Sequence, residues 1–335
     1  MKSVSFLEKN VTDAIKGMAI LLVITMHILP MLDTLLPHEL VRFLTPTGGI
    51  GVAIFLFLSG YGIQESYKKT GLNRYWQKRI LKVVIPWALF KIILLLLHPT
   101  DIVGAPYRNE ISGIQTGGYF EDFILDIACL KTPYWWYIGF AMKWYVIYWV
   151  SRRYLGKYGD VFMLGYAIAM FFTIENLKSQ QCLSFLFGVL TSANKQKITA
   201  VITPKLLYWS LGITIAAFFA LIIKQLPSIR GFETESVIMK TVELMIKLPL
   251  GLGVVGAMQY LFPYQNTLIC RKLWSLLFFT GIISYELYII HMEVLRFLND
   301  WAWNIVILLV VSYHLAYAYN HFSKKITDSI KTILT

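Results

Sequence analysis

The hydrophobic residues of this chain gather into about ten long apolar segments separated by short polar connections. Several segments are shorter than the ~20 residues that cross a bilayer upright, so their boundaries are approximate. The pattern predicts an all-α fold, a polytopic transmembrane helix bundle of about ten spans. The stretch Tyr119–Leu130 is amphipathic and predicts a helix at the membrane interface before the fourth span. The predicted spans lie near residues 14–32, 48–66, 80–98, 134–150, 160–175, 181–192, 205–223, 237–262, 274–292 and 301–319.

The composition supports this fold class. Hydrophobic residues make up 57% and charged residues 15% of 335 residues, which is too apolar for a soluble domain. The three cysteines have no CxxC spacing, so they indicate neither a disulfide framework nor a metal site. No repeat of solenoid length is visible. We therefore expect residues 1–335 to form a single integral-membrane domain, with no appended soluble domain.

The basic residues predict the orientation of the bundle. A formal net charge of +12 can indicate nucleic-acid binding, but in a membrane protein basic residues usually mark cytoplasmic loops. Most of the 31 lysines and arginines lie near residues 70, 155, 195 and 271 or near the two ends of the chain, and few lie near 40, 108 and 230. This distribution predicts that both termini are cytoplasmic and that nucleic acid is not a partner.

The first predicted span carries a polar triad on an otherwise apolar helix. Lys16 and His27 are eleven residues apart, so on a helix they share a face and lie roughly 16 Å apart along the axis. Asp13 lies one turn before Lys16 and can pair with it. A histidine inside an apolar helix is costly to ionise and is rarely placed there for packing. A hydrogen bond from His27 to a neighbouring helix is the simpler interpretation, and a catalytic role is the alternative.

The second span has a face of mostly small residues. Gly51, Phe55, Ser59 and Gly62 recur at helical spacing. Such a face allows either tight helix packing, which is the simpler interpretation, or the close approach of a narrow ligand.

Two further clusters contain residues that could bind a ligand or take part in a reaction. Arg79 and Lys82 are one turn apart at the start of the third span, where they can anchor the topology, bind anionic lipid or hold the phosphates of a nucleotide cofactor.

In the ninth span, Ser284, Tyr288 and His291 share one face. That helix should run in the same direction as the first, which places His291 and His27 at similar depth. His291 is expected either to orient another group or to take part in chemistry itself.

Taken together, these motifs resemble the acyltransferase-3 family of membrane-bound acyltransferases, whose members move acyl groups onto surface glycans and related acceptors. The chain has Asp13-x-x-Lys16-x10-His27, Gly51-x3-Phe55-x3-Ser59-Gly60, Arg79-x-x-Lys82 with Pro86, and Ser284-Tyr285-x-x-Tyr288-x-x-His291. The run Trp135-Trp136-Tyr137-Ile138 resembles a further family element. Two positions depart from the family pattern, because Lys16 and Lys82 stand where arginine is usual. Lysine keeps the charge but loses the bidentate fork.

The resemblance implies acyl transfer, usually of acetyl from cytoplasmic acetyl-CoA, to a hydroxyl of a glycan or other saccharide acceptor. His27 would act as the base that takes the hydroxyl proton, and the catalytic set would be His27, Lys16, Ser59 and His291. Acyl-CoA would be a co-substrate on Arg79, Lys82 and Lys16, with no cofactor bound permanently. Orienting or substrate-binding roles would fall to Asp13, Ser284, Tyr285, Tyr288 and Trp136. Direct transfer and an acyl-enzyme route both remain open.

Two other functions compete. A secondary transporter or flippase of a glycan or lipid-linked intermediate would use polar residues inside the spans, such as Lys91, Lys143 and Glu243, to line its path. The chain lacks the paired, Gly/Pro-interrupted segments that inverted-repeat transporters show. A non-catalytic scaffold would leave Lys16 and His27 unexplained. We therefore expect a multi-pass acyltransferase of the cell membrane, in a bacterium the inner or plasma membrane.

Overall fold

The computed structural model describes residues 6–33, 35–97, 135–202, 205–265, 267, 270–298 and 301–334. In these ranges the chain is built from helices and contains no strand, which confirms the predicted all-α class. The N-terminal helices are α1 (Lys9–Ile28), α2 (His38–Leu44), α3 (Thr47–Thr70), α4 (Tyr75–Arg79), the π-helical turn η2 (Ile80–Val84) and α5 (Ile85–Leu97). The predicted interfacial helix Tyr119–Leu130 lies outside the described residues.

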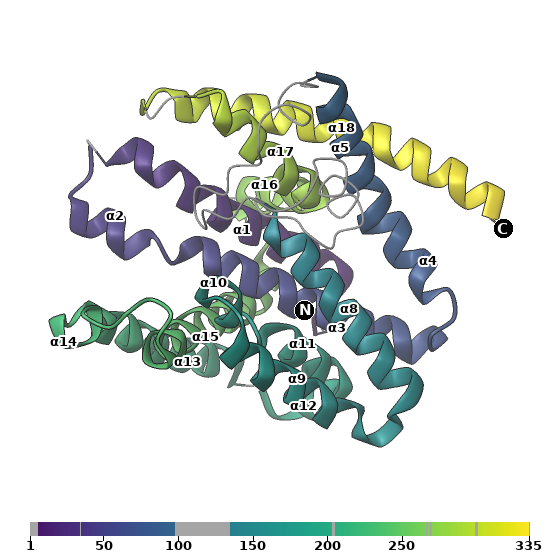
Figure 1. Ribbon diagram of the computed structural model, residues 1–335, viewed down its shortest axis with the longest axis horizontal. Helices are drawn as coiled ribbons and strands as arrows, with labels where there is room; N and C mark the ends of the chain where they lie inside the picture. Colours follow the sequence, from purple (N-terminus) through teal and green to yellow (C-terminus); the bar gives the residue numbers. More distant parts are fainter. Residues whose placement is uncertain are drawn as a thin grey trace.

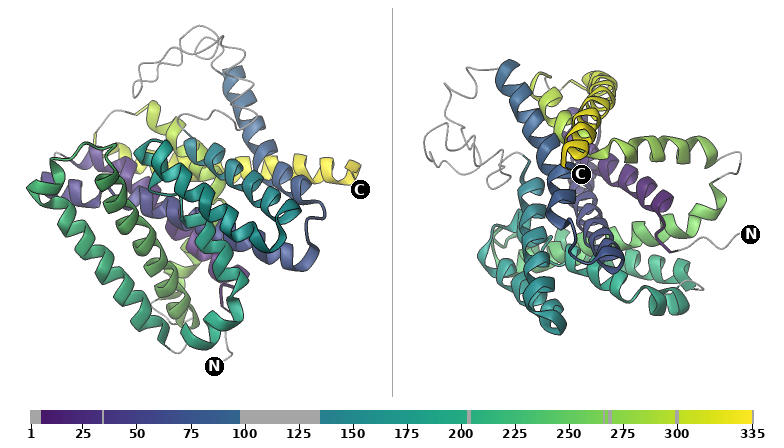
Figure 2. Two further views of the ribbon diagram at one scale, coloured as in Figure 1. Left: turned by 60° about the horizontal axis from the view of Figure 1, so that its bottom comes forward. Right: turned by 90° about the vertical axis from the view of Figure 1, so that its right-hand side faces the viewer.

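The remaining helices complete a bundle in which α1 and α3 lie next to each other at the centre (Figure 1). The pair α13 and α15 packs side by side at the edge (Figure 2). The middle part of the chain forms α8 (Trp136–Tyr154), α9 (Gly159–Thr173), α10 (Asn176–Ser179), α11 (Ser184–Ala193) and α12 (Lys195–Ile202). The last part forms α13 (Leu206–Gln225), α14 (Pro227–Arg230), α15 (Val237–Leu261), α16 (Cys270–Ile282), α17 (Ser284–Arg296) and α18 (Asn304–Leu334).

Each of the ten predicted spans coincides with a helix or a helix pair, but fewer are long and apolar enough to cross a membrane alone. Among the described residues six segments meet that requirement, or seven if the bent pair α16–α17 counts as one span. α9 has 15 residues and α11 has 10, which corresponds to about 22 Å and 15 Å of helix. The six segments are Lys9–Leu32, His38–Thr70, Tyr75–Leu97, Leu206–Gln225, Val237–Tyr264 and Asn304–Ile333.

Exposed apolar side chains indicate which surfaces face lipid. On α9 the exposed set includes Val161, Ile168 and Phe172, and α13 and α18 expose comparable rows. Apolar surface of this extent marks a membrane or partner contact. The short helix α9 therefore presents the same kind of surface as the longer membrane-spanning helices.

The ninth predicted span is not one straight helix. The chain bends by 80° between α16 and α17, at Ile283. The prediction of a continuous helix over 274–292 is therefore wrong at this point. Ser284, Tyr288 and His291 all lie after the bend, on α17, so their helical spacing is kept.

A π-helical turn precedes Pro86. Proline has no backbone N–H and its ring crowds the carbonyl four residues earlier, which is that of Lys82. The chain widens over Ile80–Val84, where the N–H of Ile85 bonds the carbonyl of Ile80. Such turns occur mostly as single irregular turns inside α-helices and are frequent at functional sites. Here the turn carries Lys82 and directly follows Arg79.

Small residues on α3 allow two neighbouring helices to approach closely. A Cβ atom on Gly51 would overlap the carbonyl oxygen of Ala19 on α1, and one on Gly60 would overlap that of Phe185 on α11. The helix-packing interpretation is confirmed for Gly51 but is wrong for Gly62, which is exposed and where an added Cβ atom would have nothing within 4 Å. Since α3 touches α1 on one side and α11 on another, the helix is fixed along most of its length.

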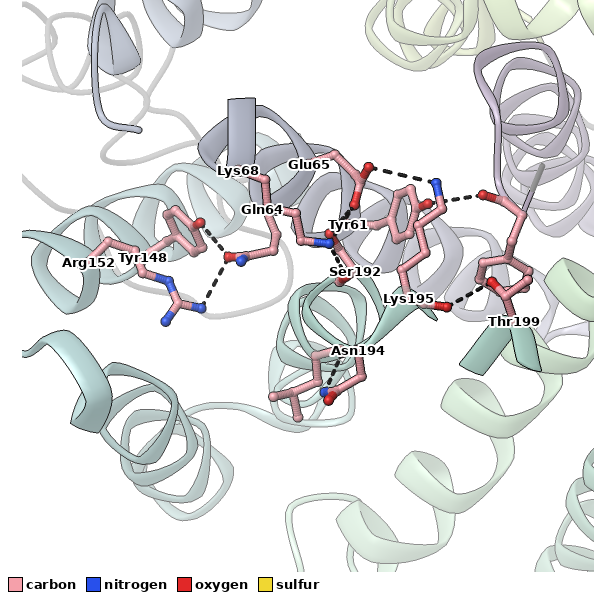
Figure 3. A network of polar contacts seen from close by, with 12 residues as sticks. Tyr61, Gln64, Glu65, Lys68, Tyr148, Arg152, Ser192, Asn194, Lys195 and Thr199 are labelled. Carbon is pink, nitrogen blue, oxygen red and sulfur yellow. Dashed lines mark hydrogen bonds and ion pairs between the residues drawn. The ribbon is translucent and has the colours of Figure 1, made fainter. Parts of the chain in front are cut away.

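A polar network holds the end of α3 that follows Gly60 (Figure 3). Glu65 accepts hydrogen bonds from Lys68 at 3.0 Å and from the Ser192 hydroxyl on α11 at 2.6 Å. The side-chain amide oxygen of Gln64 accepts one from the hydroxyl of the buried Tyr148 on α8 at 2.6 Å. These bonds tie α3 to α8 and α11, and so fix the segment of α3 that carries Ser59.

Candidate active site

Two histidines from opposite ends of the chain meet in the bundle. Nδ1 of His27, on α1, lies 3.1 Å from Nε2 of His291, on α17. The rings are stacked, with centroids 5.1 Å apart and planes 24° apart. His291 is fully buried and His27 is partly buried. The structure therefore brings the two histidines of the sequence motifs together at one depth.

The neighbours of His291 determine which nitrogen of His27 is free. Nδ1 of His291 lies 2.7 Å from the carbonyl oxygen of Leu287, which can only accept, so Nδ1 carries the hydrogen. In a neutral ring Nε2 of His291 is then an acceptor, and it receives the hydrogen on Nδ1 of His27. Nε2 of His27 keeps its lone pair, and no described side chain or backbone group occupies it with a hydrogen bond. This nitrogen is the one that can take a proton.

A cavity of about 690 Å³ opens between α1, α3, the α4–η2 segment, α17 and α18. It collects residues from all four sequence motifs, although they come from segments far apart in the chain. The predicted residues that line it are Lys16, Ser59, Arg79, Lys82, Ser284, Tyr285 and Tyr288.

The cavity ends one aromatic layer from the histidines. Tyr288 lines it, and the ring centroid of Tyr288 lies 6.1 Å from that of His291. Tyr137 and Phe55 line the same end, with Tyr137 5.4 Å from Tyr288 and 5.9 Å from Phe55 between ring centroids. A ligand that fills this cavity would place its innermost atoms against Tyr288, one helical turn from His291.

The other end of the cavity is strongly basic. The guanidinium of Arg79 lies over the rings of Tyr75 and Tyr145, 5.9 Å and 5.7 Å from their centroids. Its Nε is buried without a hydrogen-bond partner among the described residues. No described carboxylate forms an ion pair with Arg79 or Lys82. Lys16 does pair, with Asp13 at 2.9 Å, which confirms the predicted contact. Arg79 and Lys82, which have no described counter-charge, are therefore suited to bind an anionic ligand.

The four residues expected to be catalytic do not share one place. Gly48 lies against Met26 and Gly51 against Val23, so α1 and α3 run antiparallel. Ser59, eight residues beyond Gly51, is about 12 Å further toward the end of α1 that carries Lys16. Lys16 and Ser59 therefore belong to the basic end of the cavity, whereas His27 and His291 lie at the other end.

Two of the predicted hydroxyl groups are engaged by backbone carbonyls. The Ser284 hydroxyl donates to Gly281 at 3.0 Å, and the Tyr285 hydroxyl donates to Val83 at 2.9 Å. The second bond links α17 to the π-helical turn beside Lys82. These contacts give both residues a role in positioning the cavity wall.

The aromatic run Trp135–Ile138 forms the start of α8, and the residue predicted to orient substrate is not the one that reaches the cavity. Trp136, the residue singled out, contacts Phe140 and does not line the cavity. Its two neighbours contact the site: the Trp135 indole donates a hydrogen bond to the Ile289 carbonyl on α17 at 3.0 Å, and Tyr137 lines the cavity. Four aromatic or aliphatic residues in a row carry no periodicity that distinguishes the buried face.

Some residues of the site belong to none of the sequence motifs. The Tyr145 hydroxyl lies 2.6 Å from Oγ of Ser59. From α18, Asn320 and Lys324 line the cavity. A tyrosine in an aromatic helix and a lysine near the end of a chain give no signal until the helices are assembled.

These features define a multi-pass helical membrane protein with a histidine pair beside a basic cavity. The model of the acyltransferase-3 family, described as an acyltransferase domain, matches residues 11–309. The match covers most of the chain, so the chain belongs to this family and is a membrane acyltransferase. Comparisons with curated proteins and with solved structures found no match.

Proposed function

We propose that the protein transfers an acyl group, acetyl by default, from cytoplasmic acyl-CoA to a hydroxyl of a cell-surface or exported glycan. In this proposal residues 1–335 form one domain of a bacterial inner or plasma membrane. The chain crosses it about ten times, with both termini in the cytoplasm. The observation that carries the proposal is the hydrogen-bond chain from His27 through His291 to the Leu287 carbonyl, which leaves Nε2 of His27 available as a base.

The histidine pair can perform this chemistry with balanced proton transfers. Nε2 of His27 takes the proton of the acceptor hydroxyl while its oxygen attacks the thioester carbonyl carbon. The tetrahedral intermediate collapses, the carbon–sulfur bond breaks, and the imidazolium returns the proton to the CoA thiolate. His291 accepts the hydrogen on Nδ1 of His27 throughout, so it holds the ring in the required tautomer.

The developing oxyanion needs a donor close to the histidines. Ser59 lies toward the basic end of the cavity, and the Ser284 and Tyr285 hydroxyls already donate to carbonyls. Tyr288 lines the inner end of the cavity and lies next to His291. We assign the oxyanion contact to the Tyr288 hydroxyl.

The donor would enter at the basic end. Arg79, Lys82 and Lys16 would bind the CoA phosphates, and the pantetheine arm would run along the cavity toward Tyr288. Entry of the donor at the basic end agrees with the predicted cytoplasmic position of the loop near residue 70. Lysine at positions 16 and 82 binds phosphate as a point charge, without the bidentate geometry of arginine.

The proposal is tested by replacing His27 with asparagine, which cannot accept a proton at neutral pH. The acetyl-ester content of the surface glycan is measured by mass spectrometry in cells that express wild type or His27→Asn. Acetyl-CoA binding is measured separately on the purified proteins. We expect transfer to fall about 10²–10⁴-fold, the typical contribution of base catalysis, with donor affinity kept. Normal glycan acetylation by a His27→Asn protein present at wild-type level would refute the mechanism.

A further inference from the structure

One wall of the cavity lies outside the family match and has no role in the mechanism above. α18 continues past residue 309, where the match ends, and contributes a polar face to the cavity. The lining residues recur every three or four positions, so they share one side of the helix. They are Asn320, Ser323, Lys324, Thr327, Asp328 and Lys331.

This face adds a second group of cations to a cavity that already has one. The first group lies on α1 and the α4–η2 segment and comprises Lys16, Arg74, Lys78, Arg79 and Lys82. The second, Lys324 and Lys331, comes from α18, whose C-terminal part lies on the same side of the molecule as α4 (Figure 1). Only two described carboxylates line the cavity, Glu286 and Asp328. The cavity therefore has a large excess of positive charge, supplied from two walls.

Two groups of cations fit a ligand with two separate phosphate groups. CoA has a diphosphate between pantetheine and adenosine, and a distinct 3′-phosphate on the ribose. Arg79 and Lys82 on the first wall suffice for the diphosphate. Residues 307–319 of α18 lie with residues 290–298 of α17, and Asn320 hydrogen-bonds Glu286 near the start of α17, so α18 runs antiparallel to α17. Lys324 is one turn beyond Asn320 and Lys331 is about 16 Å beyond Asn320, so both lie on the side away from His291 and the aromatic end of the cavity. A phosphate beyond the diphosphate would lie on that side.

We propose that Lys324, supported by Lys331, binds the 3′-phosphate of the CoA donor and so selects 3′-phosphorylated CoA thioesters over their dephospho forms. The assignment rests on the proposed function, because it presumes that CoA occupies this cavity. It deepens that function by naming a specificity-determining residue on a part of the chain that the family match does not include.

An anionic lipid headgroup is the other source of a phosphate at this place, since lysines at the end of a membrane helix commonly meet lipid. The structure offers a matched control for this. Lys325, next to Lys324, is exposed but does not line the cavity. Either lysine could bind an anionic lipid headgroup, whereas a ligand in the cavity would contact Lys324 and not Lys325.

The experiment measures the binding of acetyl-CoA and of 3′-dephospho-acetyl-CoA to the purified full-length protein in non-ionic detergent at about 0.15 M salt. We expect wild type to bind acetyl-CoA roughly tenfold more tightly, the effect of one charge-assisted phosphate contact. Lys324→Ala should lose this preference by weakening acetyl-CoA alone, and Lys324→Ala/Lys331→Ala should abolish it. Lys325→Ala should keep it, and Lys324→Arg, which retains the charge, should keep most of it.

Each other result overturns a defined part of the proposal. If wild type binds both donors equally, the 3′-phosphate site is wrong while the proposed function stands. An equal loss for both donors in Lys324→Ala would show a general charge effect and reject the assignment. If the loss appears only in nanodiscs containing anionic lipid, and equally for both donors, the lysine binds lipid. Failure of wild type to bind either donor would reject the proposed function itself.

Discussion

Gly17 on α1 and Gly281 on α16 pack backbone against backbone. A Cβ atom on Gly17 would overlap the carbonyl oxygen of Leu277, and one on Gly281 would overlap that of Asp13. This crossing lies one residue from Lys16 and three residues before Ser284. It therefore sets the spacing between the helix that carries His27 and the bend that leads to His291.

Replacing Gly281 with alanine should destabilise the protein, because the added methyl group meets backbone that cannot rotate away. We expect a loss of about 1–3 kcal/mol, the usual cost of overpacking, measured as a lower thermal unfolding midpoint in detergent. Gly212→Ala on α13 is the control, since a Cβ atom there has nothing within 4 Å. That variant should be neutral or stabilised by about 0.5–1 kcal/mol. Equal midpoints for the two variants would contradict the packing argument.

Much of the fold was predictable because apolar segments and helical spacing are local properties. The ten predicted segments all coincide with helices, and the pairs Asp13–Lys16 and Ser284–Tyr288 follow from spacing on one helix. The bend at Ile283 was not predictable, because Gly281 meets α1 through a contact between residues more than 260 positions apart. The number of segments that cross the membrane also depends on tertiary context, as α9 shows, since it is short but exposes apolar side chains.

The site was predictable as a set of residues but not as an arrangement. Sequence motifs identified His27 and His291 and the basic pair Arg79 and Lys82. They could not show that Ser59 lies away from the histidines, because that follows from the antiparallel register of α1 and α3. Nor could they assign the tautomer of His27, which depends on the carbonyl of Leu287.

The hydrogen bond between His27 and His291 predicts different results for two substitutions of His291. The amide oxygen of glutamine can reach the position of Nε2 and accept from Nδ1 of His27, whereas asparagine is shorter and reaches only the position of Nδ1. We expect His291→Gln to retain more turnover than His291→Asn, and both to lose less than the 10²–10⁴-fold expected for His27→Asn. Turnover is measured as release of free CoA thiol in the presence of acceptor. Loss of all activity in both His291 variants, with normal activity in His27→Asn, would place the base on α17.

The basic pair predicts a specific loss of donor binding. Arg79→Ala and Lys82→Ala should each weaken acetyl-CoA binding by about tenfold or more, the effect of a lost charge-assisted hydrogen bond, and Lys82→Arg should be tolerated. Lys69→Ala is the control, because Lys69 is exposed near the same loop but does not line the cavity. Calorimetric titration of the purified proteins checks the prediction. Unchanged affinity in the Arg79→Ala/Lys82→Ala double variant would leave the pair as a topology anchor.

The orientation in the membrane is open to a direct test. The distribution of basic residues predicts that the loops near residues 70, 155, 195 and 271 are cytoplasmic and that those near 40, 108 and 230 are external. Single cysteines at three exposed positions, Lys157→Cys, Lys197→Cys and Arg230→Cys, can be introduced into a background without Cys129, Cys182 and Cys270. A membrane-impermeant thiol reagent added to intact cells should label position 230 alone, and all three positions should react after permeabilisation. Because α9 and α11 are too short to cross upright, positions 157 and 197 are the critical ones. Labelling of either from outside would reject the ten-span arrangement and place part of the basic surface on the outer side.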